Sequence, residues 1–363
     1  MIRVGIITMY HNSVNYGGVL QAYALTEILN EIGFDAVQID YDFWPEFNSP
    51  NNSIKRMIKN VIEGFYLKRR RKEFSSFRMH IPHTENTYTL EDIYKCNDIF
   101  DVFITGSDQV WNMDGFHEPF FLTFVEESKK KISYAAGMGT EKITEDTKER
   151  YKNLLHGYNA ISVREIESVD ILGPLVNKEV AVSLDPTLLL DTKTWDKVSS
   201  SRLYNKGYVF AYLIGNDQIA RNLVMAFAKE KKLQVVTIPH VNGYSKMDQN
   251  FGDKKMYDAS PADFISLIKH AEYVFTDSFH CCVFSSLYHK DYYVFERTGK
   301  RGMSSRIENI TALFNAQTHF LQDDKNRELE YVLSLKPIQY DEKSYLEAKE
   351  KSIEYLRRNV NTD

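Results

Sequence analysis

The chain has 363 residues, more than one ordinary hydrophobic core accommodates, so we expect two domains. Its 43% hydrophobic and 26% charged residues exclude a disordered chain, and a net charge of −5 argues against a general nucleic-acid binder. Three cysteines are too few for a disulfide framework, no apolar run is long enough to span a membrane, and the N-terminus lacks the features of a signal peptide. We therefore expect a cytoplasmic enzyme.

The first half of the chain alternates short apolar strands with helices and polar loops. Strands are expected at 4–9, 36–39, 102–105, 132–135 and 160–163, and the first helix at about 19–32. The loop 11–18 lies where a Rossmann phosphate loop would, but it has neither the G-x-G-x-x-G pattern nor a P-loop lysine. Gly17 and Gly18 permit close approach of a ligand. Asn15 and Tyr16 offer it hydrogen bonds, and an ordinary turn is the alternative.

A second polar segment, Gly106-Ser-Asp-Gln-Val-Trp-Asn112, follows the strand at 102–105. Gly106 permits the turn, and Asp108, Gln109 and Asn112 are suited to binding hydroxyl groups. Trp111 would stack on the face of a sugar ring, so the segment suits carbohydrate. The alternative is that the same polar groups satisfy a buried loop.

An arginine, Arg164, directly follows the strand at 160–163. At this end of a strand, arginine is a natural bidentate partner for a carboxylate or a phosphate group. The alternative is an ion pair with a neighbouring acid, Glu165 or Glu167.

The second half repeats the strand and helix alternation from Gly207 onward. Expected elements are strands at 208–214 and 234–238, helices at 218–231 and 261–270, and a strand–turn–helix–strand unit at 273–295. In that last unit a helix N-terminus lies behind Thr276, Asp277, Ser278 and His280. An imidazole beside backbone N–H groups suits an anionic ligand that needs a proton. The alternative is a helix cap followed by a histidine with a structural role.

Both halves therefore predict an α/β fold of two doubly wound, Rossmann-like domains that face each other across a cleft. We expect an N-terminal domain at 1–185 and a C-terminal domain at 186–340. The final segment, 341–363, contains a helix near 345–358 that we expect to pack back on the first domain.

Seven blocks of the sequence resemble the polysaccharide pyruvyl transferase family, in the family's order. They are Asn15-Tyr-Gly-Gly-Val-Leu-Gln-Ala-Tyr-Ala-Leu25, Gly106-Ser-Asp-Gln-Val-Trp-Asn112, Ser133-Tyr-Ala-Ala136, Ser162-Val-Arg-Glu165, Leu184-Asp-Pro-Thr187, Thr276-Asp-Ser-Phe-His280 and Ser305-Arg306. The resemblance implies a fold like that of B-type glycosyltransferases. It also implies transfer of a pyruvyl group from phosphoenolpyruvate to a sugar of a cell-surface polysaccharide or its lipid-linked precursor, forming a cyclic ketal.

Under this resemblance His280 is the general acid, and Asp108 either accepts a hydroxyl proton or orients the sugar. The N-terminal domain is the acceptor side and the C-terminal domain the donor side. Donor-binding residues are Arg164, Arg306, Ser278 and Phe279, and acceptor-binding residues are Asn15, Tyr16, Gly17, Gly18, Gln109, Trp111 and Asn112. No metal and no cofactor beyond the co-substrate phosphoenolpyruvate are expected.

Several family members have Arg-Leu-His where this chain has Ser278-Phe-His280, which removes one cation from the expected donor pocket. Arg306, or Arg301 in the same loop, would restore the charge. Cys281 and Cys282 are more readily explained by packing than by thiol chemistry. The alternative functions are a nucleotide-sugar-dependent B-type glycosyltransferase and a non-catalytic carbohydrate-binding homologue.

The segment 53–77 combines an apolar stripe at helical spacing with the basic run Lys68-Arg-Arg-Arg-Lys72. One interpretation is peripheral contact with anionic membrane at the inner face of the cell membrane, which would bring the enzyme to a lipid-linked acceptor. The alternative is a helix packed on the first domain with a solvated, charged end.

Overall fold

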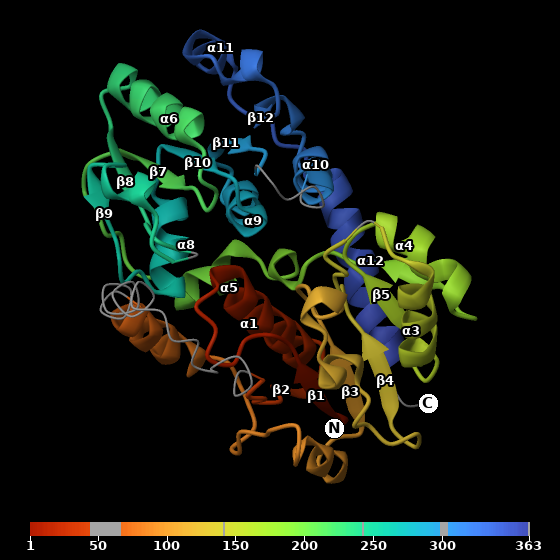
Figure 1. The fold of residues 1–363 in the computed structure, drawn as a ribbon. Helices are drawn as coiled ribbons and strands as arrows, with labels where there is room; N and C mark the ends of the chain where they lie inside the picture. Colours follow the sequence, from red (N-terminus) through yellow and green to blue (C-terminus); the bar gives the residue numbers. More distant parts are fainter. Residues whose placement is uncertain (44–66, 141, 242, 298–303, 362–363) are drawn as a thin grey trace, which may run out of the picture. The chain divides into compact units, whose positions relative to one another are not determined.

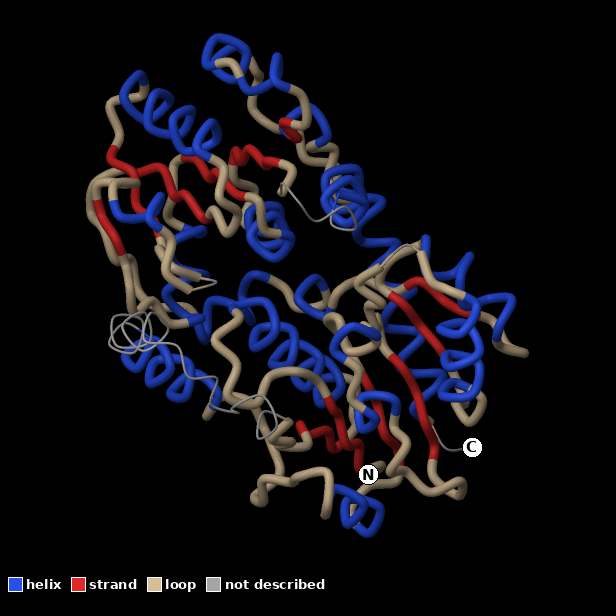
Figure 2. Tube along the Cα trace, in the orientation of Figure 1, coloured by secondary structure: helices blue, strands red, loops and turns tan. Residues whose placement is uncertain are grey.

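The computed structural model describes residues 1–43, 67–140, 142–241, 243–297 and 304–361 (Figure 1). It divides the chain into two compact units: the first comprises Met1–Pro50, Arg78–Leu190 and Leu346–Asp363, and the second Asn51–Phe77 and Asp191–Tyr345. In both, parallel strands alternate with helices (Figure 2). Among the described residues, no helix is long and apolar enough to cross a lipid bilayer.

The first unit is built on a parallel sheet in the order β2-β1-β3-β4. Its strands are β1 (Arg3–Ile7), β2 (Asp35–Gln38), β3 (Val102–Thr105) and β4 (Lys130–Ser133). Single bridges, Ile132 with Ala160 and Ala136 with Val163, connect β4 and the residues after it to the region of β5 (Ile161–Val163), which pairs with β6 (Val180–Val182). β1 and β3 are almost wholly buried, as is typical of parallel strands covered on both faces. Because β2 lies on one side of β1 and β3 on the other, the topological switch point of this unit is between β1 and β3.

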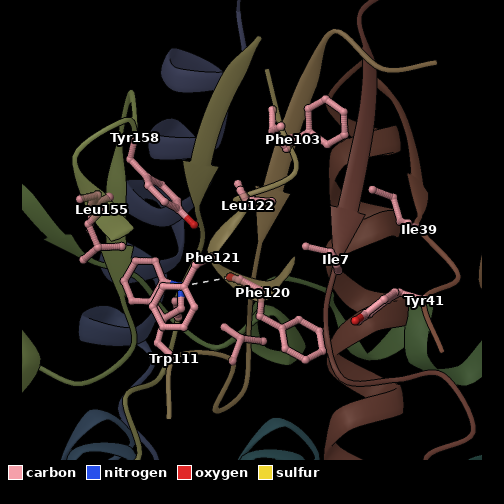
Figure 3. Close-up of a cluster of buried hydrophobic side chains, with 14 of the residues drawn as sticks. Ile7, Ile39, Tyr41, Phe103, Trp111, Phe120, Phe121, Leu122, Leu155 and Tyr158 are labelled. Carbon is pink, nitrogen blue, oxygen red and sulfur yellow. Dashed lines mark hydrogen bonds between the residues drawn. The ribbon is translucent and has the colours of Figure 1, made fainter. Parts of the chain in front are cut away.

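Helices cover this sheet and enclose an aromatic core. The helices are α1 (Tyr16–Glu31), α3 (Glu145–Leu155), α4 (Glu167–Leu172) and α12 (Lys343–Val360), with 3-10 turns η2 (Ile93–Asp98), η3 (Met113–Gly115), η4 (Glu118–Phe121), η5 (Gly173–Leu175) and η6 (Pro186–Leu188). The rings of Trp111 and Phe121 stack at 5.9 Å inside the core, with Tyr158 edge-on to Trp111 (Figure 3). α12 packs on the same unit, because the Tyr355 hydroxyl donates a hydrogen bond to the Ser133 carbonyl at 3.0 Å.

The chain leaves the first unit after Leu190, five residues later than the boundary expected after residue 185. The reason is local packing: η6 contacts α1, and Leu188, Leu189 and Leu190 are all buried. The carboxylate of Asp185 caps η6 by accepting a hydrogen bond from the Thr187 backbone N–H at 3.0 Å. Residues 186–190 are therefore part of the first hydrophobic core.

The second unit is built on a six-stranded parallel sheet in the order β12-β11-β10-β7-β8-β9. Its strands are β7 (Tyr208–Tyr212), β8 (Gln234–Thr237), β9 (Lys254–Lys255), β10 (Tyr273–Thr276), β11 (Asp291–Phe295) and β12 (Phe320–Leu321). Its helices are α5 (Thr192–Val198), α6 (Gln218–Glu230), α7 (Lys246–Gln249), α8 (Pro261–Lys269), α9 (Phe279–Leu287), α10 (Ser304–Leu313) and α11 (Leu329–Ser334), with η7 (Gln317–His319) and η8 (Asp324–Arg327). The switch point of this unit is between β7 and β10, because β8 and β10 flank β7 on opposite sides.

Residues 67–78 are helical, and the part up to Phe77 belongs to the second unit rather than the first. Arg70 fixes this helix to the unit. Its guanidinium donates hydrogen bonds to the backbone carbonyls of Pro239, His240 and Tyr257 at 2.7, 3.1 and 3.0 Å, and only 2% of the residue is exposed. One alternative from the sequence was that this charged run is exposed to solvent. The structure shows that one of its residues, Arg70, is buried. The apolar stripe of residues 54–65 lies outside the described residues.

Candidate functional site

The polar loop after β1 is shorter than expected, because α1 begins at Tyr16 rather than near residue 19. The side-chain oxygen of Asn15 caps the helix by accepting a hydrogen bond from the Gly18 N–H at 3.4 Å. Tyr16, Gly17 and Gly18 consequently form the first, buried turn of α1. At Gly18 a Cβ atom would lie 3.3 Å from the Met9 carbonyl oxygen, so a small residue lets the helix approach the end of β1.

Asp108 lies at the switch point of the first unit, on the loop that follows β3. Gly106 has φ +119° and a Cβ atom there would collide with the Tyr134 carbonyl, so the turn requires glycine. The peptide bond between Gly106 and Ser107 is cis. Ser107 fastens the loop to α1 by donating its N–H to Gln21 Oε1 at 2.9 Å. A Cβ atom at Gly18 would be 3.5 Å from Asp108 Oδ2, so the Asp108 carboxylate faces the first turn of α1.

Arg164 lies behind Asp108 and is already paired with acids. Its Nε donates to Glu165 Oε1 at 3.0 Å and its Nη1 to Asp185 Oδ2 at 2.9 Å, while Nη2 is 4.0 Å from Asp108 Oδ1. Only 5% of the side chain is exposed. Burial alone would lower the pKa of Arg164, but the three carboxylates outweigh it and hold that pKa above its ordinary value.

The donor-binding role expected for Arg164 stays a prediction, and the pairing of its guanidinium with acids argues against it. Three carboxylates lie within 4.0 Å of its guanidinium, so an anion such as phosphoenolpyruvate would have to compete with them for this cation. The ion pair with Glu165, which was the alternative interpretation, is the arrangement found. We assign Arg164 to positioning the acids, including Asp108.

The expected stacking of Trp111 on a sugar is wrong. Trp111 is 0% exposed, and its indole N–H donates to the Phe120 carbonyl at 3.3 Å inside the core (Figure 3). Gln109 and Asn112 are half-buried and pack around Gly139, where a Cβ atom would be 3.3 Å from Gln109 Cδ. The Asn112 side chain also caps η3 by accepting a hydrogen bond from the Asp114 N–H at 2.9 Å. Their binding of an acceptor stays a prediction, as does that of Asn15 to Gly18.

At the switch point of the second unit, Asp277 ties the end of β10 to the end of β7. Its carboxylate accepts hydrogen bonds from the backbone N–H groups of Ile214 at 2.8 Å and Gly215 at 2.6 Å. A Cβ atom at Gly215 would be only 2.9 Å from Asp277 Oδ2, so glycine permits this contact. Thr276 reinforces the turn, because its hydroxyl donates to the Tyr212 carbonyl and accepts from the Ser278 N–H.

Immediately after this turn, α9 begins with Ser278 at its N-cap position. The Ser278 hydroxyl makes no capping hydrogen bond with α9, a helix whose residues are all described. His280 lies in the first turn, half-buried, with its ring edge-on to Phe279 at 5.1 Å. The cysteines that follow are wholly buried, and burial raises the pKa of the Cys281 thiol to about 12. They are therefore packing residues, as the more favoured interpretation had it.

The sequence reasoning missed a cation in this region, Arg297. It follows β11 by two residues, and its Nη2 donates to the Asp277 carbonyl at 2.9 Å. Its Nε lies 3.7 Å from Asp277 Oδ2. The rule that places functional side chains after parallel strands would have identified it, because the strand–turn–helix–strand unit expected at 273–295 ends two residues before it. Arg306, on α10, is 5% exposed, and Arg301 lies outside the described residues.

In the described part of the chain, no group of three or more histidine, cysteine, aspartate or glutamate side chains is arranged to hold a metal ion. Two sets of residues are therefore candidates for function, and each lies within its own unit. The first is acidic and contains Asp108, and the second contains His280 and Arg297.

Comparison with solved structures identifies the fold. UDP-GlcNAc 2-epimerase from Methanocaldococcus jannaschii matches with a TM-score of 0.58 at 12% identity, over 98% of this chain and 99% of that chain. UDP-GlcNAc 2-epimerase from Neisseria meningitidis, bound to UDP-GlcNAc, matches with a TM-score of 0.54 at 11% identity, over 99% and 100%. At such low identities the likeness shows the fold alone, which is the two-domain, Rossmann-like fold of B-type glycosyltransferases.

No curated protein matches the chain significantly. The family model described as polysaccharide pyruvyl transferase matches residues 15–296, which include Asp108, Arg164 and His280. Because this match extends over most of the chain, the protein belongs to the polysaccharide pyruvyl transferase family.

Proposed function

We propose that the protein transfers a pyruvyl group from phosphoenolpyruvate to a sugar of a cell-surface polysaccharide or its lipid-linked precursor, and that the product is a cyclic ketal. Family membership supports a transferase of this kind. The observation that carries the proposal is the set of residues at the switch point of the second unit. There His280 occupies the first turn of α9, and Arg297 is held against Asp277 at the end of the adjacent strand.

The proposed chemistry uses His280 as the acid. Its proton adds to C3 of phosphoenolpyruvate, so the C2–C3 double bond becomes a single bond and C2 becomes electrophilic. A sugar hydroxyl oxygen bonds to C2 and loses its proton, the C2–O bond to phosphate breaks, and a second hydroxyl bonds to C2. Of the two protons released by the hydroxyls, one restores His280 and the other leaves with phosphate.

Donor binding in this proposal belongs to the second unit. Arg297 supplies the cation that the Ser278-Phe-His280 sequence lacks, and Arg306 is the second candidate. The N-terminus of α9 at Phe279 adds a favourable dipole for phosphate or carboxylate. The acidic set around Asp108 in the first unit suits an uncharged sugar instead, since carboxylates accept hydrogen bonds from hydroxyl groups.

Ligand-dependent stabilisation distinguishes this proposal from its alternatives. A ligand present at a hundred times its Kd stabilises the folded state by about 2.7 kcal/mol, which raises the unfolding temperature measurably. Phosphoenolpyruvate alone should do so for a pyruvyl transferase. UDP-GlcNAc should do so for a nucleotide-sugar enzyme, and the two solved neighbours named above bear that substrate in their names. Protection by sugars alone would favour a non-catalytic carbohydrate-binding protein.

Turnover then tests His280. Phosphate release from phosphoenolpyruvate would be followed with p-nitrophenyl β-D-galactoside, β-D-mannoside and N-acetyl-β-D-glucosaminide as acceptors. His280→Ala should lower turnover by about two to four orders of magnitude while the protein stays folded. His289→Asn is the matched control, because His289 pairs with Glu342 at 2.8 Å on the surface and asparagine tolerates its φ of +49°. Near-wild-type turnover in folded His280→Ala would refute the assignment.

Contact with anionic membrane stays a prediction, and the structure changes how it must be tested. Arg70 anchors its helix, so reversing its charge would damage the fold whether or not a membrane is bound. Lys68 and Lys72 are exposed and suit the test. Each basic residue near an anionic surface contributes roughly 1 kcal/mol, so Lys68→Glu with Lys72→Glu should abolish any salt-sensitive co-sedimentation with anionic liposomes. Absence of wild-type co-sedimentation at low salt would refute the idea.

A further inference from the structure

A histidine–aspartate pair lies at the carboxyl ends of β1 and β2, beside the loop that leads into α1. His11 Nδ1 is 2.6 Å from Asp40 Oδ1, and the residues come from loops that follow adjacent strands. Two other donors hold the same carboxylate: the Thr87 hydroxyl at 2.6 Å and the Tyr10 hydroxyl at 3.1 Å. Asp40 is thereby fixed in place, and it orients the imidazole of His11.

Neighbouring side chains determine which nitrogen of His11 carries the proton. Arg78 Nη2 donates to the side-chain oxygen of Asn12 at 3.4 Å, which turns the Asn12 amide nitrogen toward His11. That nitrogen is 2.7 Å from His11 Nε2. An amide NH₂ only donates, so Nε2 is the accepting nitrogen and Nδ1 carries the proton that Asp40 accepts. The neutral imidazole therefore presents a basic Nε2.

Two carboxylates lie near the imidazole ring of His11. Asp40 contacts one side of the ring, and Asp42 Oδ1 is 4.0 Å from Nε2 on the other. Among the described residues, Tyr10 donates to Asp40, and Arg78 donates to the side-chain oxygen of Asn12. His11 is 13% exposed, so Nε2 is accessible once the exposed Asn12 side chain moves aside. A histidine oriented by a carboxylate is an arrangement that general bases use.

We propose that His11 is the general base for the acceptor, with Asp40 as its positioning residue; this rests on the pyruvyl transfer proposed above. The acceptor hydroxyl displaces the amide of Asn12 and donates its hydrogen bond to His11 Nε2. Its proton moves to Nε2 as its oxygen bonds to C2 of phosphoenolpyruvate, and the electron pair of the C2–C3 double bond takes a proton at C3. The proton on Nε2 then passes to the departing phosphate. Asp108 orients the acceptor in this scheme.

Turnover of the full-length protein tests the role, with phosphoenolpyruvate and the three p-nitrophenyl glycosides as substrates. His11→Ala should lower kcat by about two to four orders of magnitude, the usual contribution of a general base, with phosphoenolpyruvate affinity in calorimetry unchanged. Free imidazole added to the assay should raise the kcat of His11→Ala at least tenfold, because it replaces the missing base. Asp40→Asn should lower kcat at least tenfold with little change in KM, because the amide keeps the ring in place without its charge.

Controls separate the role of the pair from folding and from the proposed function. His83→Ala removes a surface histidine of the same unit, bound only to the Ile81 carbonyl in the described structure, and should leave kcat unchanged. His11→Gln serves if the alanine variant does not fold. The role of His11 would be wrong, with the proposed function intact, in either of two cases. The wild type turns over while a folded His11 variant keeps its kcat, or the variant loses activity that imidazole does not rescue. Absence of wild-type turnover with all three acceptors would instead reject the proposed function and this inference with it.

Discussion

Replacing Arg164 with methionine should destabilise the first unit and leave phosphoenolpyruvate binding intact. The side chain is 5% exposed and makes two hydrogen bonds to carboxylates, at 3.0 and 2.9 Å. Each such charge-assisted bond contributes about 1.5–3 kcal/mol. Removing one partner of a buried ion pair costs about 3–5 kcal/mol, because the remaining charge stays buried without compensation. We expect a loss within this range, since Glu165 and Asp185 are themselves buried.

The assay is urea unfolding followed by tryptophan fluorescence. Of the three tryptophans, Trp111 is in the core of the first unit, Trp195 is in the second, and Trp44 lies outside the described residues. A background with Trp44→Phe and Trp195→Phe therefore makes the signal report on Trp111. Adding Asp185→Asn to Arg164→Met should recover part of the loss, because it removes one uncompensated carboxylate. A folded Arg164→Met protein with stability within about 1 kcal/mol of wild type, and with phosphoenolpyruvate affinity at least tenfold weaker, would refute this reasoning.

Two further predictions concern the second and the first unit in turn. Arg70→Leu removes the guanidinium that donates to three backbone carbonyls and should lower the free energy of unfolding of the second unit by about 3 kcal/mol or more. Lys72 is exposed, so Lys72→Leu should change that free energy by no more than about 0.5 kcal/mol. Urea unfolding measures both. Burial raises the pKa of Asp40, but hydrogen bonds from His11, Thr87 and Tyr10 outweigh it and hold that pKa below its ordinary 3.8. The stability that this pairing adds is present above about pH 4 and is lost as the pH falls through the lowered pKa. The stability difference between wild type and Asp40→Asn should therefore shrink below about pH 4. A difference that stays constant down to about pH 2.5 would contradict this linkage.

Strands were the part of the fold that the sequence predicted best. β3, expected at 102–105, occupies Val102–Thr105, because a parallel strand buried on both faces is a continuous apolar run. The start of α1 was placed three residues late, since glycine is a poor helix former and Gly17 and Gly18 suggested a loop. Tertiary packing overrides that propensity here. The first turn lies against the end of β1, where a larger side chain at Gly18 would meet the Met9 carbonyl at 3.3 Å.

The side chains of the site were harder to predict than its position, because their roles depend on distant partners. The local sequence placed Arg164 after a strand and next to Glu165. It did not show that Arg164 also donates a hydrogen bond to Asp185, which is 21 residues away. His11 and Asp40 are 29 residues apart and meet because β1 and β2 run parallel in register, with Ile6 opposite Gln38. Trp111 has the composition of a sugar-binding residue, and only the packing of the loop shows that its ring faces the core.

The two sets of residues differ in charge, and this difference supports the division of labour we propose. An arginine available for anions in the first unit would give phosphoenolpyruvate a binding place there as well. However, three carboxylates lie within 4.0 Å of Arg164, and a phosphate or a carboxylate at that position would compete with them for the guanidinium. In the second unit, Arg297 is held by the Asp277 carbonyl beside the N-terminus of α9, and a helix N-terminus favours negative charge. These contacts support the proposal that the donor binds in the second unit and that the first unit binds a ligand that offers hydroxyl groups and carries little negative charge.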